Sequence, residues 1–173
     1  MLGAVIGDVI GSLFEWHNTK STEFKLYDRF TRFTDDTVLT VAIGAQAVAC
    51  AVFLARNNTS KDEIQSFIQQ KFKYNLTQRL DDIRPNYAFD PSCQGSVPQA
   101  IIAFLESTDY EDAIRKAISI GGDSDTIACI TGGIAHAYYK EIPKDIVSEV
   151  MLRLDFKLRQ VIGLFNDKYN IVI

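Results

Sequence analysis

Two short stretches of the chain set carboxylates beside hydroxyl groups directly ahead of apolar segments. The first is FTDDT (residues 33–37), and the second, GGDSDT (residues 121–126), lies far along the chain. Taken alone, each fits a helix start, because Thr and Asp favour the N-cap position and acids in the first turn complement the helix dipole. One cap needs only one acid, however, whereas each stretch supplies two and continues into a segment apolar enough to require burial. The two stretches are therefore either two separate helix caps or the two halves of one site.

The residue types in these stretches favour a metal site. Desolvating an ionised carboxylate is costly unless a positive charge accompanies it. Apart from Arg32, no Lys or Arg closely adjoins the aspartates, so a bound cation is the simplest counter-charge. Carboxylate and hydroxyl oxygens suit hard cations such as Mg²⁺, Mn²⁺ or Ca²⁺, and the two stretches together could hold a pair of them. A paired centre can position water and bind vicinal substrate oxygens, which suits hydrolysis at a sugar or phosphate centre.

A helix predicted over residues 2–14 leads to a third acid. Gly3, Gly7 and Gly11 recur at every fourth position and form a stripe without side chains on one face of this helix. Close packing against a neighbouring backbone is the favoured explanation, and clearance for a ligand is the alternative. Glu15 ends the helix and is a candidate acid–base group or gate, although a lone glutamate at a helix end is more often simply solvated.

The remaining pattern predicts an all-α fold in one domain, residues 1–173, a length suited to a single core. The predicted elements are a buried apolar helix from Asp36 to about Ala55, an amphipathic helix opened by Ser60 and Glu63, an irregular segment over 77–96, a helix with Pro98 near its start, a helix capped by Asp109, an apolar helix after residue 126, and a last helix from about Lys144 to Phe165. Only Tyr169–Ile173 has a pattern that could form a strand.

Composition excludes several classes of protein. The net charge is −4 and Lys and Arg are scattered, so we expect no nucleic-acid partner. The apolar N-terminal segment lacks a basic flank and is interrupted by Asp8, so we expect neither a signal peptide nor a membrane helix. Cys50, Cys93 and Cys129 are odd in number and widely spaced, which predicts buried reduced thiols in a cytoplasmic protein. Two histidines are too few for a histidine-rich metal site.

Three parts of the sequence carry a family resemblance. GAVIGDVIGSLFE (residues 3–15), FTDDTVLT (residues 33–40) and the segment from VPQAIIAFLES to GGDSDTIACITGGIAHAYY (residues 97–139) resemble the ADP-ribosylglycohydrolase family, the group around dinitrogenase-reductase-activating glycohydrolase. The resemblance implies an all-helical fold with two Mg²⁺ ions at the base of a cleft. It also implies hydrolysis of the bond that joins ADP-ribose to a protein side chain or a small molecule.

Matching the motifs residue by residue implies a role for each candidate. The metal ligands would be Thr34, Asp35, Asp36, Asp123, Asp125 and Thr126. The catalytic residues would be Glu15, Asp36 and Asp125, and the substrate-binding residues would be Gly121, Gly122 and Ser124. The small residues would let backbone N–H groups approach the ribose and phosphates. The expected reaction is replacement at the anomeric carbon through an oxocarbenium-like transition state, with nearby carboxylates stabilising the charge.

The sequence departs from the family pattern in two places. A block with a glycine-rich loop and a TH motif, which lines the nucleotide pocket, is missing, and we predict the junction near Ile43 and Gly44. His136 stands where the family tends to carry a small residue, and a helical histidine beside the core is favoured over one that fills vacated space. A catalytically impaired module that binds ADP-ribose and metal, or a structural protein, is therefore an alternative to an active hydrolase. Apolar surface left by the missing block would favour a homo-oligomer.

Overall fold

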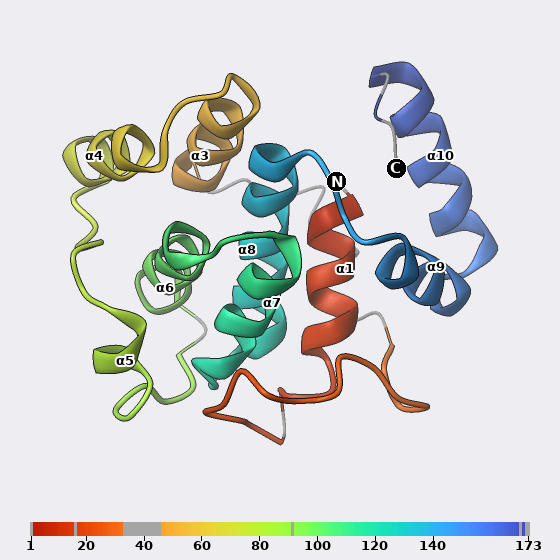
Figure 1. Ribbon diagram of the computed structural model, residues 1–173, viewed down its shortest axis with the longest axis horizontal. Helices are drawn as coiled ribbons and strands as arrows, with labels where there is room; N and C mark the ends of the chain where they lie inside the picture. Colours follow the sequence, from red (N-terminus) through yellow and green to blue (C-terminus); the bar gives the residue numbers. More distant parts are fainter. Residues whose placement is uncertain (1, 16, 33–45, 91, 170, 172–173) are drawn as a thin grey trace.

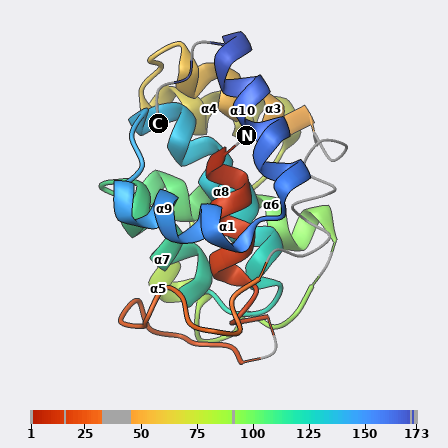
Figure 2. The same ribbon diagram turned by 90° about the vertical axis from the view of Figure 1, so that its right-hand side faces the viewer.

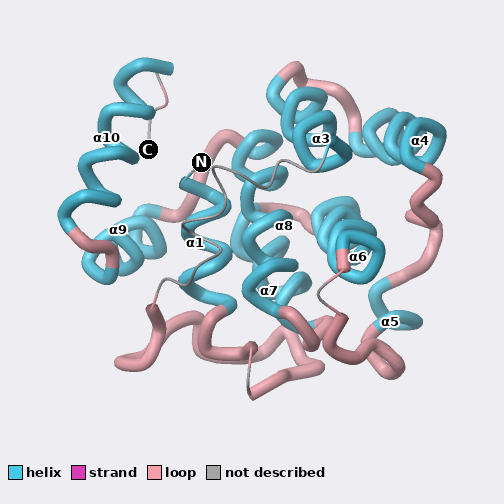
Figure 3. The backbone as a smooth tube through the Cα atoms, turned by 180° about the vertical axis from the view of Figure 1, so that it is seen from behind, coloured by secondary structure: helices cyan, strands magenta, loops and turns pink. Residues whose placement is uncertain are grey.

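The computed structural model describes residues 2–15, 17–32, 46–90, 92–169 and 171, and its regular elements there are all helices (Figure 1). They are α1 (Leu2–Gly11), α3 (Gln46–Arg56), α4 (Lys61–Phe72), α5 (Leu80–Ile83), α6 (Cys93–Glu106), α7 (Tyr110–Ser119), α8 (Ser124–Tyr139), α9 (Lys144–Arg153) and α10 (Phe156–Tyr169). Loops join them, as Figure 3 shows, and the described residues contain no strand, which confirms the all-α prediction. None of these helices is long and apolar enough to cross a membrane.

Helix α8 lies at the centre of the fold and contacts α1, α3, α6 and α7 (Figures 1 and 2). Around this centre, α4 packs on α3, α5 on α6, and α9 on the far side of α1. The largest fully buried side chains are Tyr110, Phe104, Ile6, Ile10, Ile64, Ile68, Leu80, Ile101, Ile102, Ile114 and Ile118. One continuous core therefore runs from α1 through α6 and α7 to α4.

The glycine stripe of α1 packs against the backbone of α8, and the two helices run antiparallel. A Cβ added at Gly7 would lie 2.0 Å from the carbonyl oxygen of Ala128, and one added at Gly3 would lie 2.3 Å from that of Gly132. Contacts below about 3 Å are not tolerated by real side chains, so only glycine permits this approach. The glycine stripe therefore serves close helix packing. It leaves no clearance for a ligand, because α8 occupies that space.

Two predicted helix starts are confirmed by their caps. At α4, Ser60 and Glu63 form a reciprocal capping box, in which the backbone N of Ser60 lies 3.0 Å from a carboxylate oxygen of Glu63. At α7, the side chain of Asp109 accepts a hydrogen bond of 2.8 Å from the backbone N of Asp112. Both signals act within three residues of the chain, which explains why sequence alone located them.

Lysine 61 joins α4 to the C-terminal ends of α6 and α8. Its Nζ donates to the carbonyl oxygens of Phe104 (2.9 Å) and Leu105 (3.2 Å) and to the hydroxyl of Tyr139 (2.9 Å). A cation at the carbonyl end of α6 complements the helix dipole. Burial lowers the pKa of Lys61 to about 8, since the surrounding protein solvates the ammonium less well than water does.

Other predicted boundaries are wrong. Helix α1 ends at Gly11 rather than at residue 14. Helix α6 begins at Cys93, where the hydroxyl of Ser92 accepts a hydrogen bond from the third residue of the helix, so Pro98 lies inside the helix rather than near its start. The segment over 77–96 is accordingly shorter than predicted and contains the one-turn helix α5. Each error arises where a single cap or glycine outweighed the surrounding pattern.

The predicted last helix is two helices, because the chain breaks at Leu154 and Asp155. The carboxylate of Asp155 accepts a hydrogen bond of 2.8 Å from the backbone N of Leu158 and so starts α10. An aspartate ahead of a new apolar period was the available signal. No strand forms in the described part of Tyr169–Ile173, since α10 continues to Tyr169.

The predicted apolar helix before Ala55 is described only from Gln46 onward, and the junction predicted near Ile43 and Gly44 lies outside the described residues. The described part, α3, buries Ala47 and Ala51 on one face, whereas Phe53 on another face is 65% exposed. The expectation of a wholly buried helix is therefore wrong for α3. The buried residues of α3 are Ala47, Ala51 and Ala55, and the helix packs against α8 and α4.

The three cysteines are thiols rather than disulfides, but their burial differs from the prediction. Cys129 of α8 is buried and Cys50 is half-buried, whereas Cys93 at the first position of α6 is exposed. The expectation of buried thiols therefore fails for Cys93. Its position at a helix start, ahead of the apolar part of α6, explains the exposure.

We expect Gly7→Ala to destabilise the fold by about 1–3 kcal/mol or more, the range for overpacked sites, because the new methyl group collides with the backbone of α8. Urea unfolding followed by circular dichroism measures this change. Gly163→Ala in α10 is the matched control, since nothing lies within 4 Å of its added Cβ. That variant should gain up to about 1 kcal/mol from helix propensity. Equal stability of the two variants would contradict the close contact.

Candidate functional site

The second acidic stretch forms the turn between α7 and α8. Gly121 and Gly122 have φ values of +77° and +71°, a left-handed conformation that glycine adopts without strain. Asp123 then occupies the N-cap position of α8, but its side chain makes no capping hydrogen bond. Asp123 and Asp125 are only 8% and 5% exposed. Asp123 therefore does not cap the helix with its side chain, whereas Asp125 lies in the first turn of α8, where its carboxylate accepts from a backbone N–H group. Burial of both acids is more than a helix start requires.

Burial and the neighbouring Asp123 disfavour the ionised form of Asp125. Burial raises the pKa of Asp125 to about 7, and Asp123 adds to the shift through hydrogen bonding and charge repulsion. The backbone N of Thr126 donates to the Asp125 carboxylate at 3.0 Å and offsets part of this effect. A cation between the carboxylates would relieve both the desolvation and the repulsion. Paired carboxylate oxygens are also the ligands that hard divalent ions prefer, so the donor set fits Mg²⁺ or Mn²⁺.

The end of α1 adjoins this pair of acids. A Cβ added at Gly11, the last glycine of the stripe, would lie 2.7 Å from the Cα of Asp125. One residue later, the hydroxyl of Ser12 accepts a hydrogen bond of 3.2 Å from the backbone N of Arg32. The loop that leaves α1 therefore returns to the same place at Arg32, the last described residue before the first acidic stretch. The predicted ligands Thr34, Asp35 and Asp36 themselves lie outside the described residues.

Glu15 lies in a bend beyond α1 and is half-buried. Because α1 stops at Gly11, Glu15 does not end this helix as predicted but follows it by one turn's length of chain. A further acid, Asp8, is fully buried on α1, where the sequence pattern shows it only as an interruption of an apolar run. An acid inside an otherwise apolar helix was the signal that pointed to it.

Protein atoms cover both glycines of the turn. A Cβ added at Gly122 would lie 2.5 Å from the ring of Tyr87, and one added at Gly121 would lie 2.9 Å from the Nζ of Lys20. The N–H groups of Gly121 and Ser124 are bonded within the turn, to the carbonyl oxygens of Ile118 and Gly122 respectively. The roles predicted for Gly121, Gly122 and Ser124 in substrate binding stay predictions. No local pattern could have revealed Lys20, which lies 100 residues from the turn.

Tyrosine 87 links this turn to α6. Its hydroxyl donates to the carbonyl oxygen of Gly95 at 2.9 Å. Burial raises the pKa of Tyr87 to about 12, and the negative charges of Asp90 and Asp123 act in the same direction. The phenol is therefore neutral at physiological pH and contributes packing and one hydrogen bond beside the acidic pair.

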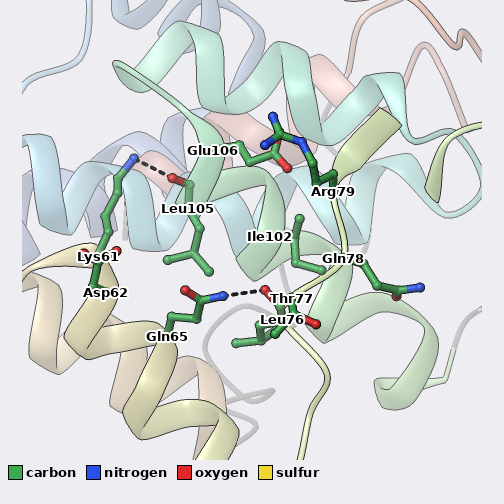
Figure 4. A pocket seen from close by; sticks show the side chains of 10 residues that line it. All are labelled: Lys61, Asp62, Gln65, Leu76, Thr77, Gln78, Arg79, Ile102, Leu105 and Glu106. Carbon is green, nitrogen blue, oxygen red and sulfur yellow. Dashed lines mark hydrogen bonds between the residues drawn. The ribbon is translucent and has the colours of Figure 1, made fainter. Parts of the chain in front are cut away.

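A pocket of about 220 Å³ lies elsewhere, between α4, the segment before α5 and the end of α6 (Figure 4). Its lining residues are Lys61, Asp62, Gln65, Leu76, Thr77, Gln78, Arg79, Ile102, Leu105 and Glu106. Gln65 spans one side by donating to the carbonyl oxygen of Leu76 at 2.6 Å. The pocket contains none of the predicted site residues. Among the residues that the structure describes, moreover, no group of three or more His, Cys, Asp or Glu side chains could hold a metal ion.

Comparison with known proteins decides the family. A model of the family described as ADP-ribosylglycohydrolase matches residues 40–169, well over half of the chain. The chain belongs to the ADP-ribosylglycohydrolase family. The matched range of this ADP-ribosylglycohydrolase-family protein includes the α7–α8 turn with Asp123 and Asp125, whereas Glu15 and the first acidic stretch precede it.

Two curated relatives of this ADP-ribosylglycohydrolase-family chain are much longer than the regions matched. An uncharacterized protein of Archaeoglobus fulgidus is 29% identical over 122 residues, which cover 61% of this chain and 39% of the relative. A protein of Acanthamoeba polyphaga mimivirus with the provisional name ADP-ribosyl glycohydrolase is 40% identical over 86 residues, which cover 46% of this chain and 24% of the relative. The chain thus spans well under half the length of either relative. No solved structure matches it significantly.

His136 lies at the contact between α1 and α8, at the end of α8 opposite Asp125. A Cβ added at Gly3 would lie 2.5 Å from the Cβ of His136, so the histidine lies against the glycine stripe. Burial lowers the pKa of His136 to about 4, and the positive charge of Arg56 adds to the shift. This position agrees with the favoured interpretation of a helical histidine beside the core.

We expect His136 to make the stability of the fold depend on pH between about 6.5 and 4. In that range the unfolded chain binds a proton at this imidazole and the folded chain does not, so the free energy of unfolding falls as the pH falls. Urea unfolding at pH 7 and pH 4.5 gives the free energy of unfolding at each pH. Its decrease between the two should be about 2 kcal/mol smaller in His136→Gln than in the wild type. His17→Gln, at the exposed second histidine, is the control and should keep the wild-type dependence. An unchanged dependence in His136→Gln would contradict the shift.

Proposed function

We propose that this member of the family catalyses Mg²⁺-dependent hydrolysis of the glycosidic bond that links ADP-ribose to a protein side chain or a small molecule. Family membership supports the type of reaction. The observation that carries the proposal is the pair of aspartates, Asp123 and Asp125, buried together at the start of α8 and against the end of α1. Two carboxylates buried side by side carry a desolvation cost that a bound cation would relieve, and groups perturbed in this way cluster at functional sites.

The proposed metal centre combines both acidic stretches. Its ligands are Thr34, Asp35, Asp36, Asp123, Asp125 and Thr126, for two Mg²⁺ ions or for Mn²⁺ in their place. When bound, such ions hold vicinal hydroxyls and polarise water. One contact supports a shared site. The backbone N of Arg32, just before the first acidic stretch, is bonded to Ser12 at the end of α1. The same end of α1 packs against Asp125 of the second stretch.

In this proposal the chain's own residues position the substrate and stabilise charge. Asp36 and Asp125 place negative charge beside the anomeric carbon, where positive charge develops in the transition state. Glu15 is the acid–base or gating residue, and its half-buried position leaves it accessible from solvent. Gly121, Gly122 and Ser124, the proposed substrate-binding residues, form the backbone that carries Asp123 and Asp125 and so set the shape of the site beside the substrate's ribose and phosphates.

A second candidate function is a module that binds metal and ADP-ribose without turnover. The feature that favours it is the absence from the sequence of the glycine-rich loop and TH motif that line the nucleotide pocket in the family, with the junction predicted near Ile43 and Gly44. Walls of that pocket would then be missing, while Asp123 and Asp125 are retained. ADP-ribose with Mg²⁺ would raise the melting temperature of such a module, and no ADP-ribose would be released from any substrate.

We also propose that the chain forms a homo-oligomer through α9 and α10. Leu152, Phe156 and Leu164 are 72%, 71% and 65% exposed on these two helices, which lie outside α1 (Figure 2). Large exposed apolar side chains favour association when they lie in a common interface. Light scattering should give a mass above that of the monomer, and Leu164→Lys should lower it. A monomeric wild-type protein would contradict the proposal.

The main test is the release of ADP-ribose from ADP-ribosylated protein or small-molecule substrates, measured by chromatography over a Mg²⁺ titration. We expect Asp125→Asn, like Asp36→Ala, to lower the rate roughly 100-fold or more, because each removes a charge that the transition state requires. Asp145→Asn, at an exposed aspartate in the first turn of α9, is the matched control and should keep the wild-type rate. Release that persists in EDTA, or in Asp125→Asn, would overturn the proposed mechanism.

A further inference from the structure

Lysine 20 connects three separate segments at the α7–α8 turn. Its Nζ donates to the carbonyl oxygen of Ile120 at 2.6 Å and to that of Tyr87 at 2.9 Å. These carbonyls belong to the last residue before the glycine turn and to the loop after α5. The loop that carries Lys20 passes beside both, at the end of the molecule where α1 and α7 stop (Figure 1). One side chain therefore bridges these three segments.

The contact with Ile120 acts directly on the turn that carries the acids. Ile120 is the C-cap residue of α7, so a cation on its carbonyl oxygen also complements the negative end of that helix. Gly121 and Gly122 follow in the left-handed conformation, and glycines there leave the turn many alternative conformations. Since Asp123 comes next in the chain, an external restraint on the turn determines where its carboxylate lies.

The contact with Tyr87 restrains the same turn from its other side. The ring of Tyr87 lies against Gly122, and its hydroxyl is bonded to the carbonyl oxygen of Gly95 on α6. By holding the backbone of Tyr87, Lys20 also keeps this ring in place. The two glycines are thus enclosed by Lys20 on one side and by Tyr87 on the other.

The rest of the Lys20 loop is held independently, so the effect of Lys20 is local. Arg115 of α7 donates to the carbonyl oxygens of Phe24 (2.8 Å) and Thr22 (3.3 Å). Arg153 of α9 reaches the carbonyl oxygen of Asp28 at 3.4 Å. Loss of the Lys20 contacts therefore weakens the restraint on the turn and on the Tyr87 backbone without releasing the loop as a whole.

We infer that Lys20 is a positioning residue for the proposed metal centre: it holds the Gly121–Gly122 turn so that Asp123 and Asp125 present their carboxylates to the same cation. The presence of a cation in this inference rests on the proposed function. The restraint on the turn rests on the two hydrogen bonds of Lys20. Lys20 acts through the backbone, since both of its assigned bonds go to carbonyl oxygens. Groups that orient metal ligands in this way typically change metal affinity by about 10–100-fold.

The test compares Lys20→Met with two matched variants. Lys20→Arg keeps a donor that can reach carbonyl oxygens, and Lys25→Met removes an exposed lysine from the same loop. Two measurements are made on each purified protein: hydrogen–deuterium exchange over residues 121–126 without metal, and the Kd for Mn²⁺ by calorimetry. We expect Lys20→Met to speed exchange over this turn and to raise the Kd roughly 10-fold or more. Lys20→Arg should recover most of both values, and Lys25→Met should match the wild type.

The outcomes separate the inference from the function on which it rests. Unchanged exchange over residues 121–126 in Lys20→Met overturns the inference, and so does faster exchange with an unchanged Kd for Mn²⁺. A wild-type protein that binds no Mn²⁺ contradicts the proposed metal centre, and the exchange rates alone then decide whether Lys20 holds the turn. A fall in melting temperature shared by Lys20→Met and Lys25→Met, without a local change in exchange, would reduce Lys20 to a general stabilising residue and also overturns the inference.

Discussion

The close approach of α1 and α8 is the constraint on which the rest of the structure depends. Gly3, Gly7 and Gly11 let the backbones of these helices touch, and a methyl group at any of them would force the helices apart. Because α8 also contacts α3, α6 and α7, its position fixes the whole core. The same contact ends at Asp125, so the packing of α1 on α8 also determines where this residue of the candidate site lies.

The candidate site brings two buried carboxylates together at one end of α8, beside a turn whose conformation requires glycine. Burial and the neighbouring Asp123 disfavour the ionised form of Asp125, and Gly121 and Gly122 adopt left-handed conformations. Interactions from distant segments hold this arrangement: Tyr87 packs on the turn, and Lys20 binds the carbonyl oxygen before it. Such local costs are characteristic of functional sites, where the surrounding structure maintains a geometry that the segment would not adopt alone. The family match over this turn is consistent with that interpretation.

Sequence reasoning succeeded where the physical signal is local. The caps at Ser60 and Asp109 and the all-α class were predicted because a cap or a helical period is complete within a few residues. It failed at the break before Asp155, where one cap interrupts a continuous apolar pattern, and at Cys93, whose exposure depends on what covers the start of α6. Helix existence was therefore more predictable than helix boundaries.

The sequence by itself determined the helical class, the family and the residue types of the candidate site, since the motif with Asp123 and Asp125 can be recognised without coordinates. Only the tertiary structure decided that these acids are buried and that Asp123 makes no side-chain cap, that the glycine stripe serves packing, and that Lys20 lies on the turn. The reason is that desolvation and close backbone approach depend on which segments meet in space. Lys20 and Ile120 are 100 residues apart, and no local pattern records their contact.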